Sequence, residues 1–223
     1  MASLPVLGEL IDITVPYSPA VPTWPGHPTP TVEPMTRIAN GDRSNVSMLH
    51  IGSHAGTHLD ANWHFIDTGK KLLEIPVDRW VGPGWVAHIP EEAPAIEVRQ
   101  RAQAGIPAGT TRLLLRTGNS TIWGTWDGVT PLTFNEHYVG LTPDAARWLV
   151  DHGIQVVGID YLSIGRFGPE NVVCHNSLLG NDVLIIENLD LSRVPAGPDT
   201  LGCLPLQVAF GVGAPGRAVL GRR

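Results

Sequence analysis

Apolar runs of strand length recur along the chain, and turns rich in glycine and proline separate them. Residues 8–15, 85–89 and 112–117 each form such a run, which is typical of a short β-strand. Residues 154–159 and 183–186 are almost continuously apolar, as expected for strands that are covered on both faces. The pattern therefore predicts a sheet with a buried centre.

Side chains alternate in polarity over residues 44–54. His50 and His54 fall on one parity of this segment, and Leu49 and Ile51 fall on the other. Alternation of this kind predicts a strand with one buried face. Because the segment runs directly into a group of further histidines, we expect the strand to end at His54 and to position that group.

Two segments carry the signals of helices. Residues 143–152 begin with a proline after a capping Thr142, and a glycine lies just past the end, so the start and stop signals agree. Residues 95–105 favour helix by composition and end at a glycine suited to the position after a helix. The first of these helices leads straight into the strand at 154–159, and the strand–helix–strand order predicts mixed α/β packing.

The composition is that of a globular protein. The chain has 223 residues, of which 43 % are hydrophobic and 16 % charged, and it is long enough to bury one substantial core without disulfides. It contains no internal repeat, charge block or linker, so a single domain over residues 1–223 is expected. Cys174 and Cys203 are too few for a disulfide framework and are expected to be buried free thiols.

Charge and hydropathy argue against two classes of partner. The net charge is −6, and the 15 Lys and Arg residues are spread thinly, so no basic stripe could neutralise several phosphates of a nucleic acid. No apolar stretch approaches the length of a membrane-spanning helix, and the N-terminus lacks the features of a secretory signal. We therefore expect a cytoplasmic protein that binds neither nucleic acid nor membrane.

His54, His58, Asp60 and His64 lie within eleven residues. A single histidine is usually a surface or hydrogen-bonded core residue, but imidazoles and a carboxylate at this density are typical of a site for a divalent metal. On a straight helix Asp60 would point away from His58, and on a straight strand His54 and His58 would lie about 13 Å apart. The segment must therefore bend, and Gly56 is suited to the turn.

The segment over residues 54–64, His-Ala-Gly-Thr-His-Leu-Asp-Ala-Asn-Trp-His, resembles the signature HxGTHxDxxxH of the cyclase family of metal hydrolases. This family includes bacterial kynurenine formamidase and isatin hydrolase. The resemblance implies an α/β class, namely the single-domain swivelling β/β/α fold with a mixed sheet, assembled as a homodimer or homotetramer. Further likeness to the family follows in the same order at residues 10–13, 22–26, 116–118, 158–163, 175 and 187–189.

The resemblance also implies a set of metal ligands. His54, His58 and Asp60 match ligands of the family, and the second half of the chain supplies the matches His175 and Glu187. These ligands imply one or two Zn²⁺ ions, with Mn²⁺ as the alternative. Without the resemblance, the position of Glu187 after an apolar run predicts an exposed strand end.

Two further residues match functional positions of the family. His64 matches the general acid and base, with an additional metal ligand or an orienting residue as the alternative. Trp24 matches an aromatic residue that lines the substrate pocket, and packing beneath a proline-rich loop is its alternative.

The sequence departs from the family's formamidases at two positions. These formamidases often carry WPGD and DxPxH, whereas here His27 replaces the Asp of the first pattern and Asn62 replaces the Pro of the second. Both departures are expected near the substrate.

The activity implied by the resemblance is hydrolysis of an aryl or cyclic amide by attack of a metal-bound hydroxide. N-formylkynurenine, the substrate of an arylformamidase, is the first candidate among small-molecule amides. Ring opening of an isatin-type lactam is the alternative, followed by another cyclase or dehydratase activity. The non-enzymatic alternative is a metal-binding module, which would have a closed ligand shell.

Residues 211–216 spell GxGxxG, the pattern of a dinucleotide-binding turn. We reject this interpretation because only seven residues follow and Pro215 interrupts the turn, which leaves no helix to hold a pyrophosphate. Arg217, which follows the pattern, is expected to be an ordinary surface arginine rather than an anchor for an acidic substrate.

Overall fold

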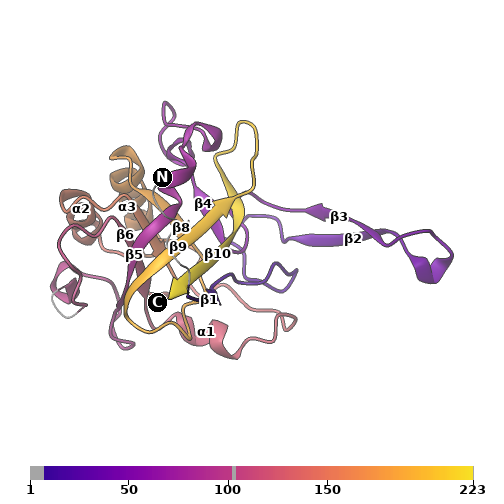
Figure 1. Cartoon of the computed structure of the whole chain (residues 1–223), viewed down its shortest axis with the longest axis horizontal. Helices are drawn as coiled ribbons and strands as arrows, with labels where there is room; N and C mark the ends of the chain where they lie inside the picture. The colour runs from indigo at the N-terminus through magenta and orange to yellow at the C-terminus, as the bar shows by residue number, and fades with distance from the viewer. Residues whose placement is uncertain (1–7, 102–103, 223) are drawn as a thin grey trace.

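A closed ring of seven β-strands forms the body of the protein, and an eighth strand extends it (Figure 1). We describe residues 8–101 and 104–222 of a computed structural model. The strands of this sheet are β1 (Glu9–Asp12), β4 (His58–Asp60), β5 (Val81–His88), β6 (Arg112–Arg116), β7 (Val156–Ile159), β8 (Leu184–Glu187), β9 (Gly197–Pro205) and β10 (Gly213–Arg222). The ring runs in the order β10, β4, β8, β7, β6, β5, β9; β9 pairs with β10 to close it, and β1 pairs with β10 outside it.

The ring combines parallel and antiparallel pairs. β5, β6, β7 and β8 are parallel to their neighbours in this group, and the other neighbours pair antiparallel. Every residue of β7 and β8 is buried, as their continuous apolar sequences predict. The predicted α/β class with a mixed sheet is therefore confirmed.

Helices α2 (Pro143–Asp151) and α3 (Pro169–Gly180) pack against each other outside the ring. The short helix α1 (Ser120–Thr125) follows β6. Of the helices in residues 8–101 and 104–222, none is long and apolar enough to cross a membrane. Short 3₁₀ turns complete the structure: η1 (Ile38–Asn40), η2 (Asn62–His64), η3 (Leu72–Glu74), η4 (Val77–Arg79) and η5 (Val98–Arg101).

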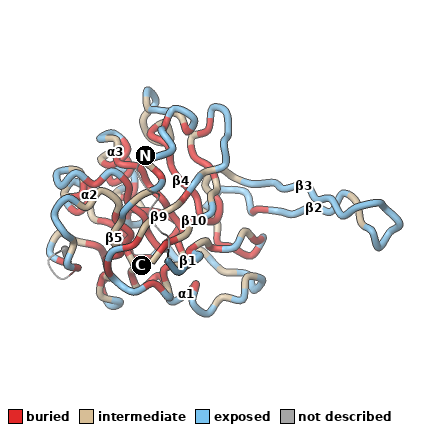
Figure 2. The backbone as a smooth tube through the Cα atoms, viewed as in Figure 1, coloured by how far each residue is buried: buried red, intermediate tan, exposed pale blue. Residues whose placement is uncertain are grey.

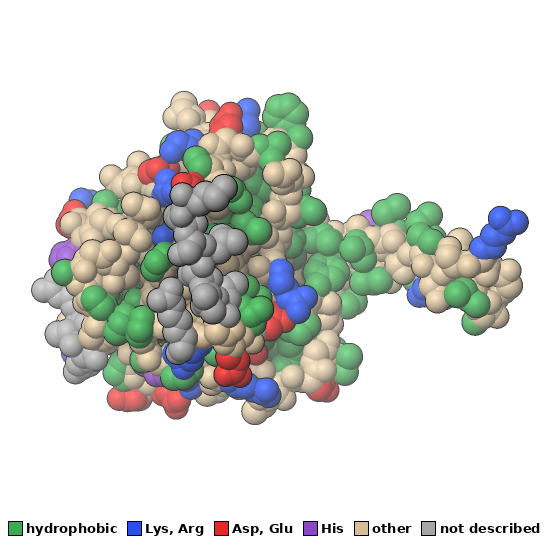
Figure 3. All heavy atoms as spheres, viewed as in Figure 1, with side chains coloured by type: hydrophobic (Ala, Val, Ile, Leu, Met, Phe, Trp, Pro, Cys, Tyr) green, Lys and Arg blue, Asp and Glu red, His purple; other side chains and the backbone are tan. Residues whose placement is uncertain are grey.

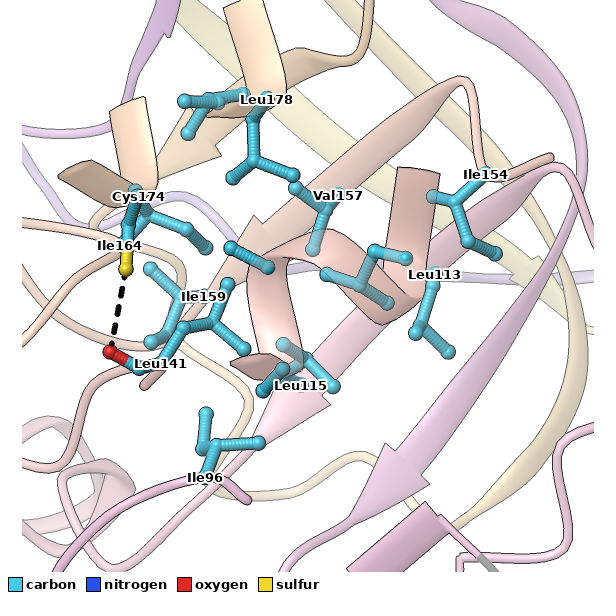
Figure 4. Close-up of a cluster of buried hydrophobic side chains, with 14 of the residues drawn as sticks. Ile96, Leu113, Leu115, Leu141, Ile154, Val157, Ile159, Ile164, Cys174 and Leu178 are labelled. Atoms are coloured by element: carbon cyan, nitrogen blue, oxygen red, sulfur yellow. Dashed lines mark hydrogen bonds between the residues drawn. The ribbon is translucent and has the colours of Figure 1, made fainter. Parts of the chain in front are cut away.

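Two hydrophobic cores lie on opposite faces of the ring wall. Within β6, Leu113 and Leu115 belong to the outer core under the helices, whereas Leu114 belongs to the core inside the ring. Figure 4 shows the outer core, where the Cys174 thiol donates a hydrogen bond of 3.4 Å to the carbonyl of Leu141. Both cysteines of the chain are buried and free, as predicted.

The predicted strands are present, with bounds that differ by a few residues. The predicted segments 8–15, 112–117 and 154–159 contain β1, β6 and β7, and residues 183–186 overlap β8. The strand predicted over residues 85–89 is too short, because β5 begins four residues earlier. Strands β9 and β10, which close the ring, were not predicted.

Helix α2 begins and ends where its sequence predicts. The Thr142 hydroxyl accepts a hydrogen bond of 3.3 Å from the Ala145 amide, and a proline occupies the first turn. Gly153 follows the helix with a φ of 74°, a conformation that favours glycine. Local sequence signals are therefore sufficient to predict this helix.

The predicted helix over residues 95–105 is wrong. Its described part contains only the turn η5, and residues 102–103 lie outside the described residues. Ile96 instead pairs with the backbone that precedes α2: its amide donates to Gly140 O at 2.9 Å, and its carbonyl accepts from Thr142 N at 3.0 Å. These tertiary hydrogen bonds override the helix-favouring composition.

The prediction for residues 44–54 is only partly correct. β3 (Val46–His50) is a strand, but it ends before His54 and has no buried face. It pairs with β2 (Thr31–Thr36), and the two strands form an arm, residues 31–50, that projects from the body (Figures 1 and 2). Alternation of polarity does not distinguish a strand on a sheet from a strand in a free hairpin.

Replacing Thr142 with alanine is expected to lower the free energy of unfolding by about 1–2 kcal/mol. The variant removes the cap of α2 and also a hydrogen bond of 3.3 Å from Thr142 Oγ1 to Ile96 O. Urea unfolding followed by circular dichroism measures the change. Thr133→Ala, in an exposed loop, is the matched control and should shift stability by less than about 0.5 kcal/mol. Equal losses in the two variants would contradict the capping role.

Candidate metal centre

Strand pairing places two carboxylates and a histidine on the same face of the sheet. His58 lies opposite Glu187 in the register between β4 and β8. Asp60 comes two residues after His58 and therefore shares its face. Leu59 and Ile186, at the alternate positions, belong to the core inside the ring. The three polar side chains consequently project from the outer face, where α3 lies.

The chain turns sharply before β4, as the spacing of the cluster predicts. Gly56 has a φ of 62°, and the ring centroids of His54 and His58 lie 5.2 Å apart. His54 Nδ1 reaches to 2.8 Å from Asp60 Oδ1. Gly213 leaves room for this contact, because a Cβ at that position would lie 2.8 Å from His54 Cε1. The GxGxxG pattern thus serves close packing beside the cluster, and its second glycine begins a strand.

Helix α3 and strand β8 complete the group of predicted ligands. His175, on α3, has its Nε2 3.2 Å from Glu187 Oε1 and 3.7 Å from Asp60 Oδ2. His58 Nε2 lies 3.1 Å from Glu187 Oε2. Because His54 contacts Asp60, the structure brings all five predicted ligands together.

The position of Glu187 after an apolar run predicts an exposed strand end, and this prediction is wrong. The residue is only 4 % exposed.

Hydrogen bonds to backbone carbonyls orient two of the imidazoles. His58 Nδ1 donates to Gly56 O at 2.8 Å, and His175 Nδ1 donates to Asn171 O at 2.8 Å. A carbonyl can only accept, so each Nδ1 carries a hydrogen, and Nε2 of each ring faces the carboxylates and is the atom that would bind a metal once it is deprotonated. Metal-ligating histidines are commonly held in this way.

The donor set fits a divalent cation. His54 Nε2, His58 Nε2 and Asp60 Oδ2 are buried and make no hydrogen bond, which costs free energy unless another partner is present. Ligand atoms of His58, Asp60 and Glu187 lie within 4.8 Å of one another, and so do those of His54, Asp60 and His64. Imidazole nitrogens and carboxylate oxygens are ligands of zinc and manganese. Asp60 belongs to both groups.

Electrostatic interactions in the centre favour charged carboxylates. Burial raises the pKa of Asp60, but the charges of His54 and His64 outweigh burial and hold the pKa below its ordinary value. Burial lowers the pKa of His58, yet the contact with Glu187 and the charge of Asp60 outweigh burial and raise this pKa to about 9. Without a cation, the two carboxylates therefore hold a proton on His58.

His64 lies at the edge of the group. The turn η2 carries it, and its ring stacks on the ring of His54 with centroids 3.8 Å apart. Burial lowers the pKa of His64 to about 4, so the ring is neutral near pH 7.

Asn62 lies at the start of the same turn, and its Nδ2 donates a hydrogen bond of 2.8 Å to Leu179 O. Asn62 thus anchors the turn to the end of α3.

A cavity of about 230 Å³ opens beside the group. Trp24, His27 and His64 contribute to its wall, together with three of the predicted ligands, His54, His175 and Glu187. The ring of Trp24 packs against Phe134 and Phe167 with centroid distances of 5.3 and 5.4 Å. Both readings of Trp24, as a pocket residue and as a packing residue, therefore agree with its position. Trp24 and Phe65 provide the cavity with an apolar side.

Two residues contribute to the site although the sequence analysis did not select them. Phe65 stacks on His175 with centroids 4.3 Å apart. Asn171 holds His175 through its carbonyl, and its Oδ1 accepts from Ser163 Oγ at 2.9 Å. Asn171 lies four residues before His175, so recognition of α3 would have pointed to it. No comparable sequence signal marks Phe65.

A third buried carboxylate, Asp160, lies outside the group. It accepts hydrogen bonds from the amides of Thr117 and Ser120, at 2.6 and 3.1 Å, and from their hydroxyls. Burial raises the pKa of Asp160 despite these bonds. The carboxylate connects the end of β7 to the start of α1 and has a structural role.

Comparisons with known proteins assign the chain to a family. A family model described as "Putative cyclase" matches residues 11–166. "Cyclase-like protein 3" of Oryza sativa subsp. japonica is 32 % identical over 221 residues, a match that covers 96 % of this chain and 80 % of the rice protein. The chain therefore belongs to the cyclase family.

Solved structures share the fold along nearly the whole chain. A "Potential Metal-Dependent Hydrolase With Cyclase Activity" has a TM-score of 0.79 and 29 % identity, and the match covers 96 % of this chain and 98 % of that one. An isatin hydrolase bound to the product analogue thioisatinate has a TM-score of 0.77 and 21 % identity, over 95 % and 91 % of the two chains. The protein thus has the fold of the cyclase-family metal-dependent hydrolases, and the resemblance found in the sequence is confirmed.

Metal binding is expected to strengthen as the pH rises from about 6 to about 8. The pKa of His58 is raised to about 9 without metal, so this predicted ligand carries a proton throughout that range and would have to lose it on binding. The association constant should rise about tenfold per pH unit for each proton released. Competition with a chromophoric chelator measures the affinity, and calorimetry in two buffers of different ionisation enthalpy counts the protons.

The variant His152→Ala is the control for this experiment. His152 is exposed and lies at the end of α2, so its removal should leave the pH dependence of metal affinity unchanged. A metal affinity that does not vary with pH in the unsubstituted protein would contradict the protonated state of His58.

Proposed function

We propose that the protein is a metal-dependent hydrolase that cleaves an aryl or cyclic amide bond of a small molecule. Zn²⁺, as one or two ions, is the proposed cofactor, with Mn²⁺ as the alternative. A catalytic metal site has an open side, whereas a structural site is closed by four ligands. The observation that carries the proposal is a group of potential ligands of which His54, His175 and Glu187 line a cavity, while His58 and Asp60 lie buried behind them.

The side chains of this group are held in place before any substrate binds. The backbone amide of Ile164 donates to Glu187 Oε1 at 2.7 Å, and the carbonyls of Gly56 and Asn171 orient two imidazoles. A divalent cation bound here supplies Lewis acidity, which lowers the pKa of a water molecule and polarises an amide carbonyl. Rigid placement of the ligands by the surrounding backbone supports this chemistry.

His64 is the proposed general acid and base. Because burial lowers its pKa to about 4, the ring is neutral near pH 7, and a ring nitrogen is free to accept a proton from the attacking water. The protonated ring then delivers that proton to the amine nitrogen as the C–N bond breaks. The position of His64 on the cavity wall supports this role.

The aromatic wall of the cavity favours an aryl amide. Trp24 and Phe65 line the cavity, and flat aryl groups stack on such rings. N-formylkynurenine, which carries a formamide on an aromatic ring, is the first candidate substrate. An isatin-type lactam is the second, because an isatin hydrolase shares the fold. In both substrates the nitrogen of the scissile amide is attached to an aryl ring.

Elemental analysis combined with hydrolysis assays tests the proposal. The purified protein should contain about one or two equivalents of zinc or manganese and should hydrolyse N-formylkynurenine or isatin. Turnover should fall at least about 100-fold after chelation and return when the metal is restored. Stoichiometric metal without turnover of either compound would overturn the proposed substrates. Purification without any metal, with none taken up on addition, would overturn the centre itself.

The variant His64→Ala is expected to keep its metal and to lose about 10²–10⁴-fold in turnover, the usual contribution of a general acid or base. Metal content by elemental analysis and turnover are measured on the same preparation. His152→Ala, at the exposed end of α2, is the matched histidine control and should retain activity. Loss of metal from His64→Ala would instead identify His64 as a ligand and refute the assigned role.

A further inference from the structure

A carboxylate at the surface, Asp182, joins three segments of the chain. Basic and acidic side chains lie close to one another over the body of the protein (Figure 3), and isolated surface ion pairs usually contribute little to stability. Asp182 differs from an isolated pair, because its carboxylate accepts hydrogen bonds from both Lys70 and Arg79. Several charges that form a network are held more firmly than one exposed pair.

Three side chains donate to Asp182. Lys70 Nζ lies 3.0 and 3.1 Å from its two carboxylate oxygens. Arg79 Nη1 donates to Oδ2 at 2.9 Å, and Arg79 Nη2 donates to the backbone carbonyl of Asp182 at 2.7 Å. Asn62 Nδ2 donates to Oδ1 at 3.2 Å. Burial raises the pKa of Asp182, but the hydrogen bonds and charges of Arg79 and Lys70 outweigh burial and lower the pKa, so the carboxylate is charged near pH 7.

Asp182 lies between two elements that carry predicted ligands. Helix α3, which carries His175, ends at Gly180, and strand β8, which ends at Glu187, begins two residues after Asp182. The backbone of Asp182 has a φ of 60°, which aspartate, asparagine and glycine adopt more readily than other residues. The Asp182 amide donates to Leu179 O at 3.3 Å. The turn after α3 therefore fixes the direction of the carboxylate.

The segment that carries His64 is folded on itself. We call residues 61–71 the η2 loop, after the turn that it contains. Near the two ends of the loop, the Trp63 amide donates to Lys70 O at 3.0 Å. Gly69 approaches the start of the loop so closely that an added Cβ would lie 2.6 Å from the carbonyl carbon of Asn62. Because the ends are joined in this way, bonds to a few side chains can hold the whole loop.

The η2 loop delivers two aromatic side chains to the candidate site. The ring of His64 stacks on His54 with centroids 3.8 Å apart, and the ring of Phe65 stacks on His175 at 4.3 Å. Displacing a catalytic group by about 1 Å can cost about 100-fold in rate. The rate of the proposed reaction therefore depends on how firmly the loop is attached to the turn after α3.

We propose that Asp182 is a positioning residue, which holds the η2 loop against the end of α3 and thereby fixes the ring of His64 beside the predicted ligands. The inference rests on the proposed function, which gives this ring its part in the hydrolysis. Asp182 does not belong to the residues that line the cavity of about 230 Å³. It acts on the reaction through Asn62 and Lys70, and not by contact with the substrate.

Hydrogen exchange on the full-length protein tests whether Asp182 holds the loop. Asp182→Gly removes the carboxylate, and glycine adopts a φ of 60° without strain, so circular dichroism and urea unfolding should report an intact fold. Amide exchange over residues 61–71 should become at least about tenfold faster. Asp182→Asn, which also tolerates this φ and keeps one acceptor oxygen, should have a smaller effect.

Asp12→Asn is the matched control for loss of the charge. The side chain of Asp12 is 46 % exposed, against 44 % for Asp182, and it also pairs with an arginine, Arg217. That pair lies between β1 and β10, away from the η2 loop. Exchange over residues 61–71 should therefore be the same in Asp12→Asn as in the unsubstituted protein.

Kinetics of N-formylkynurenine or isatin hydrolysis separate positioning from stability. Asp182→Gly should lower kcat about 10- to 100-fold, change KM by less than about threefold and leave the metal content as it was. Asp182→Asn should recover part of this loss. In a His64→Ala background, Asp182→Gly should lower kcat by less than about twofold, because the group that it positions is already missing.

Two results would overturn the inference. The first is exchange over residues 61–71 that Asp182→Gly leaves unchanged. The second is an equal loss of kcat from Asp182→Gly with and without the His64 ring, which would show that the effect does not pass through His64. Faster exchange in Asp182→Gly, in a protein that hydrolyses neither compound, would support the hold of Asp182 on the loop and refute the proposed function alone.

Discussion

Burial of two carboxylates among imidazoles is the interaction on which the rest of this site depends. Asp60 and Glu187 are almost completely removed from water, and a buried charge is expensive unless opposite charges or hydrogen bonds surround it. Each carboxylate therefore lies within 4 Å of at least two imidazole nitrogens. The buried ring nitrogens that still make no hydrogen bond indicate that a cation completes the balance of charge.

Hydrophobic packing of the ring determines where these polar groups point. β4 has only three residues, all buried, and it lies between β8 and β10. Because Leu59 packs inside the ring, strand alternation turns His58 and Asp60 outward. Glu187 points the same way because Ile186 before it packs inside. The arrangement of the candidate site thus depends on the apolar residues between the predicted ligands as much as on those ligands themselves.

Elements with a local signal could be predicted from the sequence, whereas elements that depend on contacts between distant segments could not. Helix α2 has its cap, its first-turn proline and its terminal glycine within one short stretch, and the structure confirms it. Helix α3 was not predicted because its apolar residues are not confined to one face: Val172 and Val173 are half exposed, whereas His175 is buried. The arm alternates like a sheet strand, but no neighbouring strand of the body pairs with it.

The sequence by itself determined that His54, His58, Asp60 and His64 form a compact group, that the chain must bend at Gly56, and that the chain resembles one family of metal hydrolases. These properties follow from residue types at short spacing, for which backbone geometry permits few arrangements. Only the tertiary structure decided that Glu187 is buried opposite His58 and that a cavity with an aromatic side adjoins the group. Strand pairing and helix packing between distant segments depend on the whole chain, and no local pattern of residues contains that information.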